Sequence, residues 1–165
     1  MSEPTFINSF SQAVKILPSK SVLLVIDMQN ATGNRHLGLG RLLQEAGTAE
    51  SANYRFDRIE SLLVPNIDKL LVSFRKSCAG VIYITYGAET SDARDVVSTI
   101  REIVKKTNNI VGNEEHEIVA QLQPMADELV LNKTTQGAFR STRLDSVLRA
   151  MDISTVVCVG VSTNN

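Results

Sequence analysis

Four short runs of apolar residues, rich in β-branched side chains, predict four buried strands along the chain. They cover residues 22–26, 81–86, 128–131 and 155–161. Runs that are apolar on both faces are typical of parallel sheets covered by helices on each side. Because helical patterns alternate with these runs, we expect an α/β protein: a three-layer αβα sandwich with a mostly parallel, Rossmann-like sheet and right-handed crossovers.

Apolar residues at helical spacing predict the segments that cover the sheet. Pro65 suits the first position of a helix that ends near Lys76. Three further helices are expected, over Ser91–Lys106 with Asp92 as the cap, over Glu114–Leu122, and from a cap at Ser141 to Met151. An amphipathic segment over Phe6–Leu17 is expected to lie over an edge of the core.

The connection from Ala31 to Arg58 is much longer than the usual loop between a strand and a helix. Long loops at this end of a sheet usually cover a site or contact another subunit, so we expect one of these roles. Gly38 and Gly40 suggest a dinucleotide-binding loop, but Leu43 occupies the position of the third glycine and the pattern starts well after the strand. We therefore reject this dinucleotide fingerprint, and the missing glycine disfavours nucleotide binding.

Composition indicates one globular domain with a substantial core, since 43% of the 165 residues are hydrophobic. Seventeen basic and eighteen acidic residues give a net charge of -1, without like-charged runs that would attract nucleic acid or a membrane surface. Cys78 and Cys158 lie in apolar sequence without CxxC spacing, which favours neither a disulfide nor a zinc site. With no leader or membrane-spanning pattern, we expect a soluble, cytoplasmic protein.

Polar side chains follow three of the predicted strands. Asp27 follows the first strand, Lys133 the third, and a polar segment, residues 162–165, the fourth. Parallel strands point the same way, so these ends are expected to meet at one edge of the sheet, where ligands bind in open α/β folds. Asp27 and Lys133 would form either a plain ion pair or part of a reactive site.

The sequence around these strand ends resembles the isochorismatase-like family of cysteine hydrolases, which includes nicotinamidases, carbamoylsarcosine amidase and ureidoacrylate hydrolases. Three family motifs recur in order. They are the DxQ pair Asp27 and Gln29, the lysine Lys133 followed by Gly137-Ala138-Phe139 and by Thr142 and Leu144, and the Gly160-Val161-x-Thr163 segment. The resemblance covers nearly the whole chain.

In that family the last motif continues into a nucleophilic cysteine, which would be the residue after Asn165. Cys158 is expected to be a core residue of the fourth strand and Cys78 to lie far from the strand ends, so neither replaces it. The family fold also has two further strands with helices. Residues 1–165 are therefore expected to form a single isochorismatase-like hydrolase domain that lacks its C-terminal part.

The resemblance implies a thiolate that attacks an amide-type carbonyl, with Asp27 as the base and Lys133 as the electrostatic partner. The backbone N–H of Ser162, presented by a cis peptide after Val161, would help to hold the oxyanion. Candidates for substrate binding are Gln29, Tyr86, Phe139 and Thr163, with Phe56 as a further pocket residue.

Some family members hold a metal ion through an Asp-x-His pattern, which His36 and His116 do not match. We therefore expect no metal and no cofactor, a small amide-type substrate, and a homo-oligomer. Two other functions stay open: an isochorismatase-type vinyl-ether hydrolase that uses Asp27 without a thiol, and a noncatalytic α/β binding module.

Overall fold

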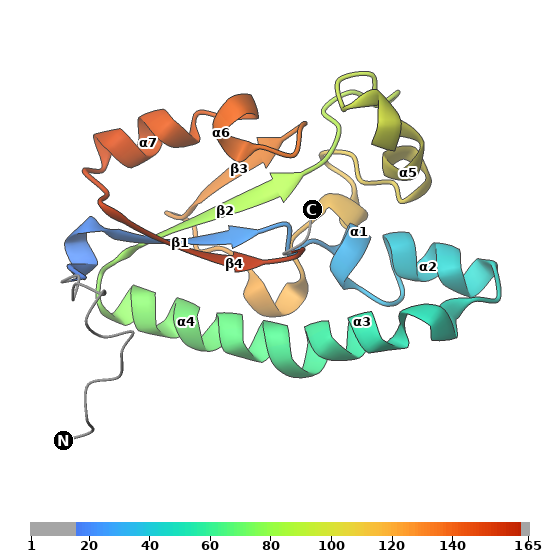
Figure 1. The fold of residues 1–165 in the computed structure, drawn as a ribbon, viewed down its shortest axis with the longest axis horizontal. Coiled ribbons are helices and arrows are strands. Elements are labelled where there is room, and N and C mark those ends of the chain that lie inside the picture. The colour runs from blue at the N-terminus through green and yellow to red at the C-terminus, as the bar shows by residue number, and fades with distance from the viewer. Residues whose placement is uncertain (1–15, 163–165) are drawn as a thin grey trace, which may run out of the picture.

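A computed structural model of the protein describes residues 16–162 and shows a four-stranded parallel sheet between two layers of helices (Figure 1). The strands lie in the order β3-β2-β1-β4. Their bounds are Ser21–Ile26 for β1, Gly80–Tyr86 for β2, Leu129–Lys133 for β3 and Thr155–Gly160 for β4. The predicted αβα sandwich and its four strands are therefore confirmed. Most of the amphipathic segment predicted over residues 6–17 lies outside the described residues.

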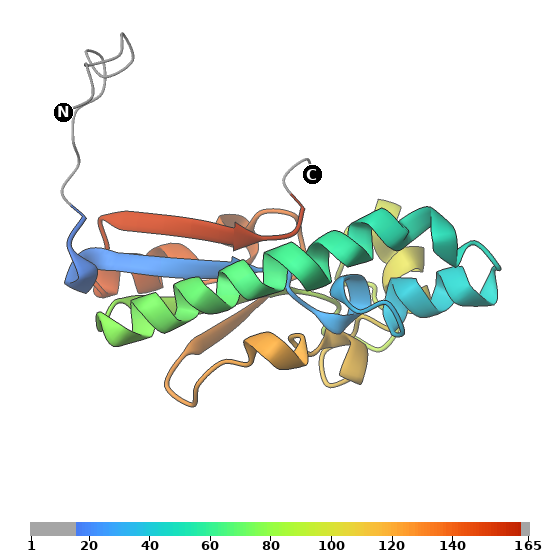
Figure 2. The same cartoon turned by 90° about the horizontal axis from the view of Figure 1, so that it is seen from below.

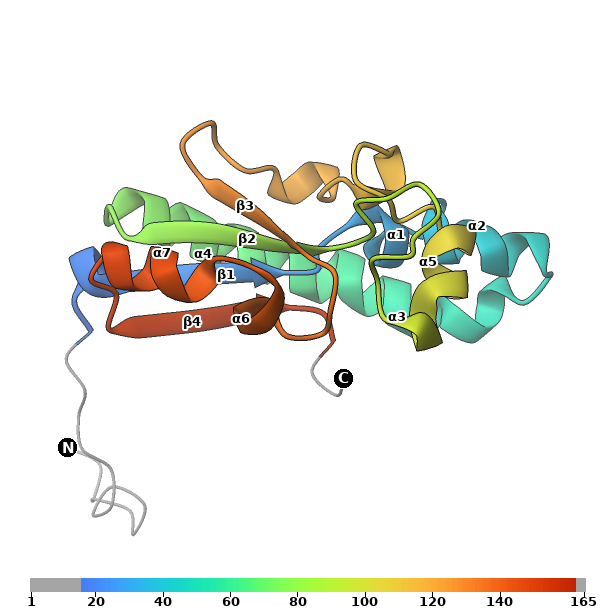
Figure 3. The same ribbon diagram turned by 90° about the horizontal axis from the view of Figure 1, so that it is seen from above.

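The two faces of the sheet bury alternate residues of the same strands. Leu23 and Val25 of β1 pack in a cluster with Leu71 of α4 (Val64–Lys76) on one face, which Figure 2 views from the helix side. Val22 and Leu24 pack in a cluster with residues of α7 (Leu144–Ala150) on the other face, seen in Figure 3. Because each buried aliphatic side chain contributes about 1.5–3 kcal/mol, these layers hold the carboxyl ends of the strands in fixed positions.

The segment expected to be a long loop after β1 is largely helical, which corrects the prediction. It contains α1 (Asn30–Gly33), α2 (Gly38–Glu45) and α3 (Asn53–Arg58). A π-helical segment, Ile59–Leu63, joins α3 to α4, so the helix predicted to begin at Pro65 begins about three turns earlier. Pro65 has no N–H to donate to the preceding turn, and the wider π-helical turn comes just before it.

The glycine pair in this segment serves close backbone packing between α1 and α2. A Cβ atom on Gly38, whose φ is +47°, would collide with the backbone of Ala31, and one on Gly40 would collide with the backbone of Arg35. The Gly-Leu-Gly sequence therefore has a structural explanation that involves no nucleotide.

Two predicted helices are mostly replaced by turns. Of the helix expected over residues 91–106, only α5 (Arg101–Lys106) and a 3₁₀ turn at Ser98–Ile100 form. The carboxylate of Asp95 accepts hydrogen bonds from the N–H groups of Glu89 and Thr90, and such side-chain bonds compete with helix formation.

The helix expected over residues 114–122 is two 3₁₀ turns, Glu114–His116 and Ala120–Leu122. Between them, Ile118 forms a bridge with Gln29, and the Val119 N–H bonds the carbonyl of Met28 at 3.0 Å. These bonds to the segment after β1 hold the chain extended there.

The cap predicted for α7 and the burial predicted for Cys158 are also wrong. Ser141 ends α6 (Ala138–Ser141), and Thr142 Oγ1 instead accepts the N–H of Leu144 at 3.0 Å. Both Cys78 and Cys158 are exposed. For Cys158 the reason is position: β4 is an edge strand of the described sheet, and Cys158 alternates with Val157 and Val159, which pack against the cluster on the α4 face.

Candidate active site

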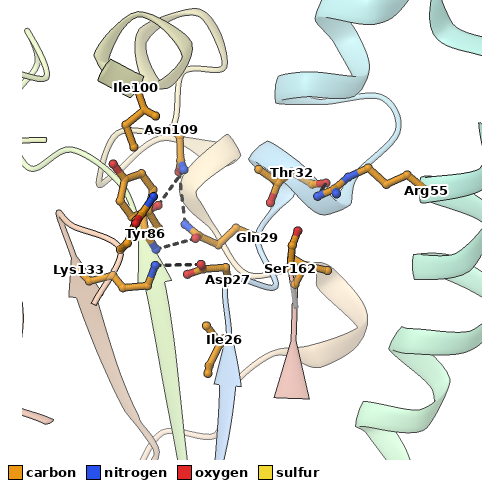
Figure 4. Close-up of a pocket in the computed structure, with 12 residues that line it drawn as sticks. Ile26, Asp27, Gln29, Thr32, Arg55, Tyr86, Ile100, Asn109, Lys133 and Ser162 are labelled. Atoms are coloured by element: carbon orange, nitrogen blue, oxygen red, sulfur yellow. Dashed lines mark hydrogen bonds and ion pairs between the residues drawn. The ribbon is translucent and has the colours of Figure 1, made fainter. Parts of the chain in front are cut away.

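The side chains that end β1 and β3 meet at the carboxyl edge of the sheet (Figure 4). Lys133 Nζ donates a hydrogen bond to Asp27 Oδ2 at 2.9 Å. Strand β2 lies between the strands that carry them, so the lysine side chain crosses over Tyr86, with Nζ 4.7 Å from the ring centroid. A cation above an aromatic face is stabilised, so Tyr86 helps to hold the ammonium in place.

Asp27 occupies an uncommon backbone conformation directly after β1. Its φ is +55°, in the left-handed region that few residues other than glycine and the short polar residues adopt. The Asp27 N–H bonds the carbonyl of Ile84 at 2.8 Å, which fixes the turn to the neighbouring strand. The carboxylate is thereby directed toward Lys133 along the carboxyl edge of the sheet, which we call the rim.

The environment of the Asp27 carboxyl is suited to proton transfer. Burial raises its pKa above the usual value, and the charge and hydrogen bond of Lys133 oppose that rise only in part. Oδ2 is bonded to the ammonium, whereas Oδ1 is buried and has no hydrogen-bond partner within residues 16–162. This arrangement leaves one carboxylate oxygen available to accept a proton from another group.

The chain leaves β4 beside this pair through a turn that requires glycine. Gly160 has φ +136°, and a Cβ atom there would collide with the carbonyl oxygen of Ile26. The next N–H, that of Val161, bonds the same oxygen at 3.2 Å. The peptide between Val161 and Ser162 is cis, as the family resemblance implies.

A cavity of about 390 Å³ lies over these strand ends, which is large enough for a small molecule. Among its walls are five residues singled out from the sequence: Asp27, Gln29, Tyr86, Lys133 and Ser162. It is also lined by residues that the sequence reasoning did not single out as site residues: Ile26, Thr32, Arg55, Ile100, Asn109, Gln136 and Val161.

Two other predicted pocket residues, Phe139 and Phe56, are not found in the walls of this cavity. Phe139 is 59% exposed, and Phe56 is buried, with the Arg35 guanidinium carbon 5.8 Å from its ring centroid. Thr163 lies outside the described residues. A substrate-binding role for Phe139 or Phe56 therefore has no support from this cavity.

Gln29 is buried and its amide is engaged by the protein. Its Oε1 accepts the N–H of Tyr86 at 2.8 Å, and its Nε2 donates to the carbonyl of His116 at 2.7 Å and to Asn109 Oδ1 at 3.3 Å. Asn109 in turn donates to the carbonyl of Tyr86 at 2.8 Å. The network ties the end of β2 to the segment around residues 109–116 and so fixes one wall of the cavity.

The described part of the chain contains no cluster of three His, Cys, Asp or Glu side chains arranged to hold a metal ion. The two histidines have separate partners: His36 Nδ1 lies 3.2 Å from Gln44 Nε2, and His116 Nε2 lies 3.0 Å from Asn132 Oδ1. Among residues 16–162, no helix has both the length and the apolar character that crossing a bilayer requires.

The fold and the rim together define an αβα-sandwich protein with a partly buried acid–amine pair at the carboxyl edge of a parallel sheet. The family model described as the isochorismatase domain matches residues 21–165, and the chain belongs to this family. The resemblance to isochorismatase-like cysteine hydrolases is thereby confirmed.

Several characterised and solved proteins are similar to this chain over most of its length. The ureidoacrylate amidohydrolase RutB of Acinetobacter baylyi is 27% identical over 93% of this chain and 64% of its own length. A cysteine hydrolase from Pseudomonas syringae pv. phaseolicola has a TM-score of 0.69 at 25% identity, with 92% of this chain and 64% of that one covered. N-carbamoylsarcosine amidase from Thermoplasma acidophilum has a TM-score of 0.62 at 26% identity, with 88% and 69% covered. The chain thus spans a little under two thirds of the length of the first two relatives.

Proposed function

We propose that this chain carries the acid–amine part of a cysteine hydrolase site that cleaves the C–N bond of a small amide, ureide or carbamoyl compound. The observation that carries the proposal is the partly buried Asp27–Lys133 pair, which lines the cavity and leaves one carboxylate oxygen unpartnered among the described residues. The similarity to a ureidoacrylate amidohydrolase and an N-carbamoylsarcosine amidase supports the substrate class.

In the proposed reaction the nucleophile is the thiol of a cysteine that follows Asn165. Asp27 takes the thiol proton through its unpartnered oxygen, and the raised pKa of this carboxyl makes it a better proton acceptor than an ordinary aspartate. The positive charge of Lys133 favours the thiolate that forms beside it. The thiolate then attacks the carbonyl carbon and a C–S bond forms.

The second half of the reaction returns the proton. As the tetrahedral intermediate collapses, Asp27 donates its proton to the leaving nitrogen, the C–N bond breaks, and a thioester remains. Water hydrolyses the thioester and restores the thiol. We propose that the Ser162 N–H, beside the cavity, donates to the oxyanion in both halves, since such donors usually provide a large part of the rate enhancement.

Tyr86 is proposed to donate a hydrogen bond to the substrate. Its hydroxyl is buried without a partner among the described residues, and the residue lines the cavity. Burial raises the pKa of this hydroxyl, and the negative charges of Asp27 and Asp95 raise it further, so the group keeps its proton at neutral pH. A buried donor without a partner is costly, and a substrate oxygen would satisfy it.

The test is ammonia release from a panel of small amides, ureides and carbamoyl compounds, measured on the protein with the residues that follow Asn165. Asp27→Asn should lose at least about 100-fold in kcat while the melting temperature changes little, because a general base contributes roughly 10²- to 10⁴-fold. Asp145→Asn is the matched control, since Asp145 is an exposed aspartate on α7. Full activity of Asp27→Asn, or a residue other than cysteine after Asn165, would contradict the proposal. Hydrolysis of a vinyl ether instead of amides would favour the isochorismatase-type reaction. Cytoplasmic location and homo-oligomerisation stay predictions.

A further inference from the structure

The guanidinium of Arg55 lies at the wall of the cavity, and no residue between positions 16 and 162 gives it a charged partner. Arg55 belongs to α3 and approaches the cavity from the side of that helix, whereas Lys133 approaches from β3 (Figure 4). Within the described residues its Nε is buried without a hydrogen-bond partner, and its Nη2 donates to the backbone carbonyl of Thr32 at 3.3 Å. Among residues 16–162, no carboxylate lies within ion-pair distance of it.

Two other partly buried arginines of the same fold have carboxylate partners. Arg35 binds the carboxylates of Asp57 and Glu60 at 2.6 and 2.8 Å, and Arg75 forms two bonds of 2.8 Å to Glu128. A guanidinium has five N–H donors, and leaving them unsatisfied away from water is costly. Arg101, which has no carboxylate partner either, donates to three backbone carbonyls, so the buried Nε without a partner distinguishes Arg55 among the arginines of the described residues. Burial lowers the pKa of the Arg55 guanidinium.

The charges in the wall of the cavity do not balance. Asp27, Lys133 and Arg55 are its only charged residues within the described part of the chain. Asp27 is already bound to Lys133, so the charge of Arg55 is left uncompensated. A site with an unpaired cation at one wall favours a substrate that brings a negative charge.

We propose that Arg55 binds a carboxylate of the substrate, so that the natural substrate is an anionic carbamoyl or amide acid. This inference rests on the proposed function, because it concerns the other end of the same substrate. A carboxylate matches the forked geometry of a guanidinium and accepts two parallel hydrogen bonds from it. Arg55 would hold the acid end while the scissile carbonyl lies at the rim beside Asp27, and it takes no part in bond breaking.

The kinetic test compares an acid with its neutral counterpart on the protein with the residues that follow Asn165. N-carbamoylglycine and its methyl ester carry the same carbamoyl group and differ in the negative charge. Arg55→Gln should raise KM for the acid by about 10- to 100-fold and leave KM for the ester within about 2-fold, because the bonds lost are charge-assisted ones. Arg58→Gln is the control, since Arg58 is an exposed arginine on the same helix and is not among the residues that line the cavity.

A binding measurement separates failure of this inference from failure of the proposed function. Calorimetry on Asp27→Asn should detect N-carbamoylglycine, and the additional change Arg55→Gln should abolish that binding, whether or not the protein hydrolyses it. Equal losses for acid and ester in Arg55→Gln would show a purely structural role and overturn the inference. So would a wild-type preference for the ester, or a bound acid that is unaffected by Arg55→Gln. Hydrolysis of neutral amides in those cases would leave the proposed function intact.

Discussion

Replacement of Lys133 by methionine tests the electrostatic description of the rim most directly. The change keeps a long side chain and removes the ammonium, so the Asp27 carboxylate stays in place without its partner. Removing one member of a fully buried ion pair costs about 3–5 kcal/mol. The Asp27 side chain is 25% exposed and that of Lys133 is 6% exposed, so water screens part of the loss and we expect about 2–4 kcal/mol at pH 8.

The loss should depend on pH in a defined direction. In the wild type the pKa of Asp27 is already raised, so between its unfolded and folded values the native state binds more protons than the unfolded state. Stability contributed by this group therefore falls as pH rises through that window. Lys133→Met removes the interaction that opposes the rise in the Asp27 pKa, so the pH range between the unfolded and folded pKa values extends to higher pH. The free energy of unfolding therefore falls further across this range, with a slope approaching about 1.4 kcal/mol per pH unit.

Urea unfolding of both proteins from pH 4 to 8 measures this effect. The difference in the free energy of unfolding should be small at pH 4, where Asp27 takes up a proton, and should grow to a plateau above the pKa of the variant. In an Asp27→Asn background the Lys133→Met change should show no such pH dependence, which completes a double-mutant cycle. A difference that stays constant across this pH range would refute the reasoning.

Three further changes test other parts of the structure. Gly160→Ala should lower the free energy of unfolding by at least about 2 kcal/mol, because the new Cβ meets the carbonyl oxygen of Ile26 and φ is +136°; a melting temperature equal to wild type would contradict the described turn. Tyr86→Phe should raise KM about 5- to 10-fold with an unchanged fold, since one buried donor is lost; equal KM values would remove its proposed contact with substrate. Leu71→Ala should lower the free energy of unfolding in urea by about 2–5 kcal/mol, because Leu71 is 1% exposed. Its neighbour Val72 is 42% exposed and should tolerate alanine within about 1 kcal/mol. Similar losses at both positions would contradict the assigned helix face.

The parts of the fold that follow from burial were predictable from the sequence. The apolar runs of β1 and β2 occupy the centre of the sheet, where both faces need apolar side chains, and so their pattern was unambiguous. The contact between Asp27 and Lys133 followed from the same reasoning, because parallel strands bring their ends to one edge.

The parts that depend on local hydrogen bonding were not predictable in this way. The apolar residues between positions 91 and 106 have helical spacing, yet bonds from the Asp95 carboxylate to neighbouring N–H groups form a turn instead. Arg55 was not predicted as a site residue, because Pro65 is typical of a helix start and so placed residue 55 in a loop. The π-helical segment before Pro65 instead joins α3 to α4, and Arg55 lies on a helix. Asn109 lies in a polar segment with no periodicity, and only the folded chain reveals its bond to Gln29.

The bond between Lys133 and Asp27 joins positions 106 residues apart along the chain. The bond requires that β3 is aligned on β2 and that β2 is aligned on β1. The chemistry proposed for the rim therefore depends on pairing between strands that are distant in the sequence, and neither β1 nor β3 can provide it alone.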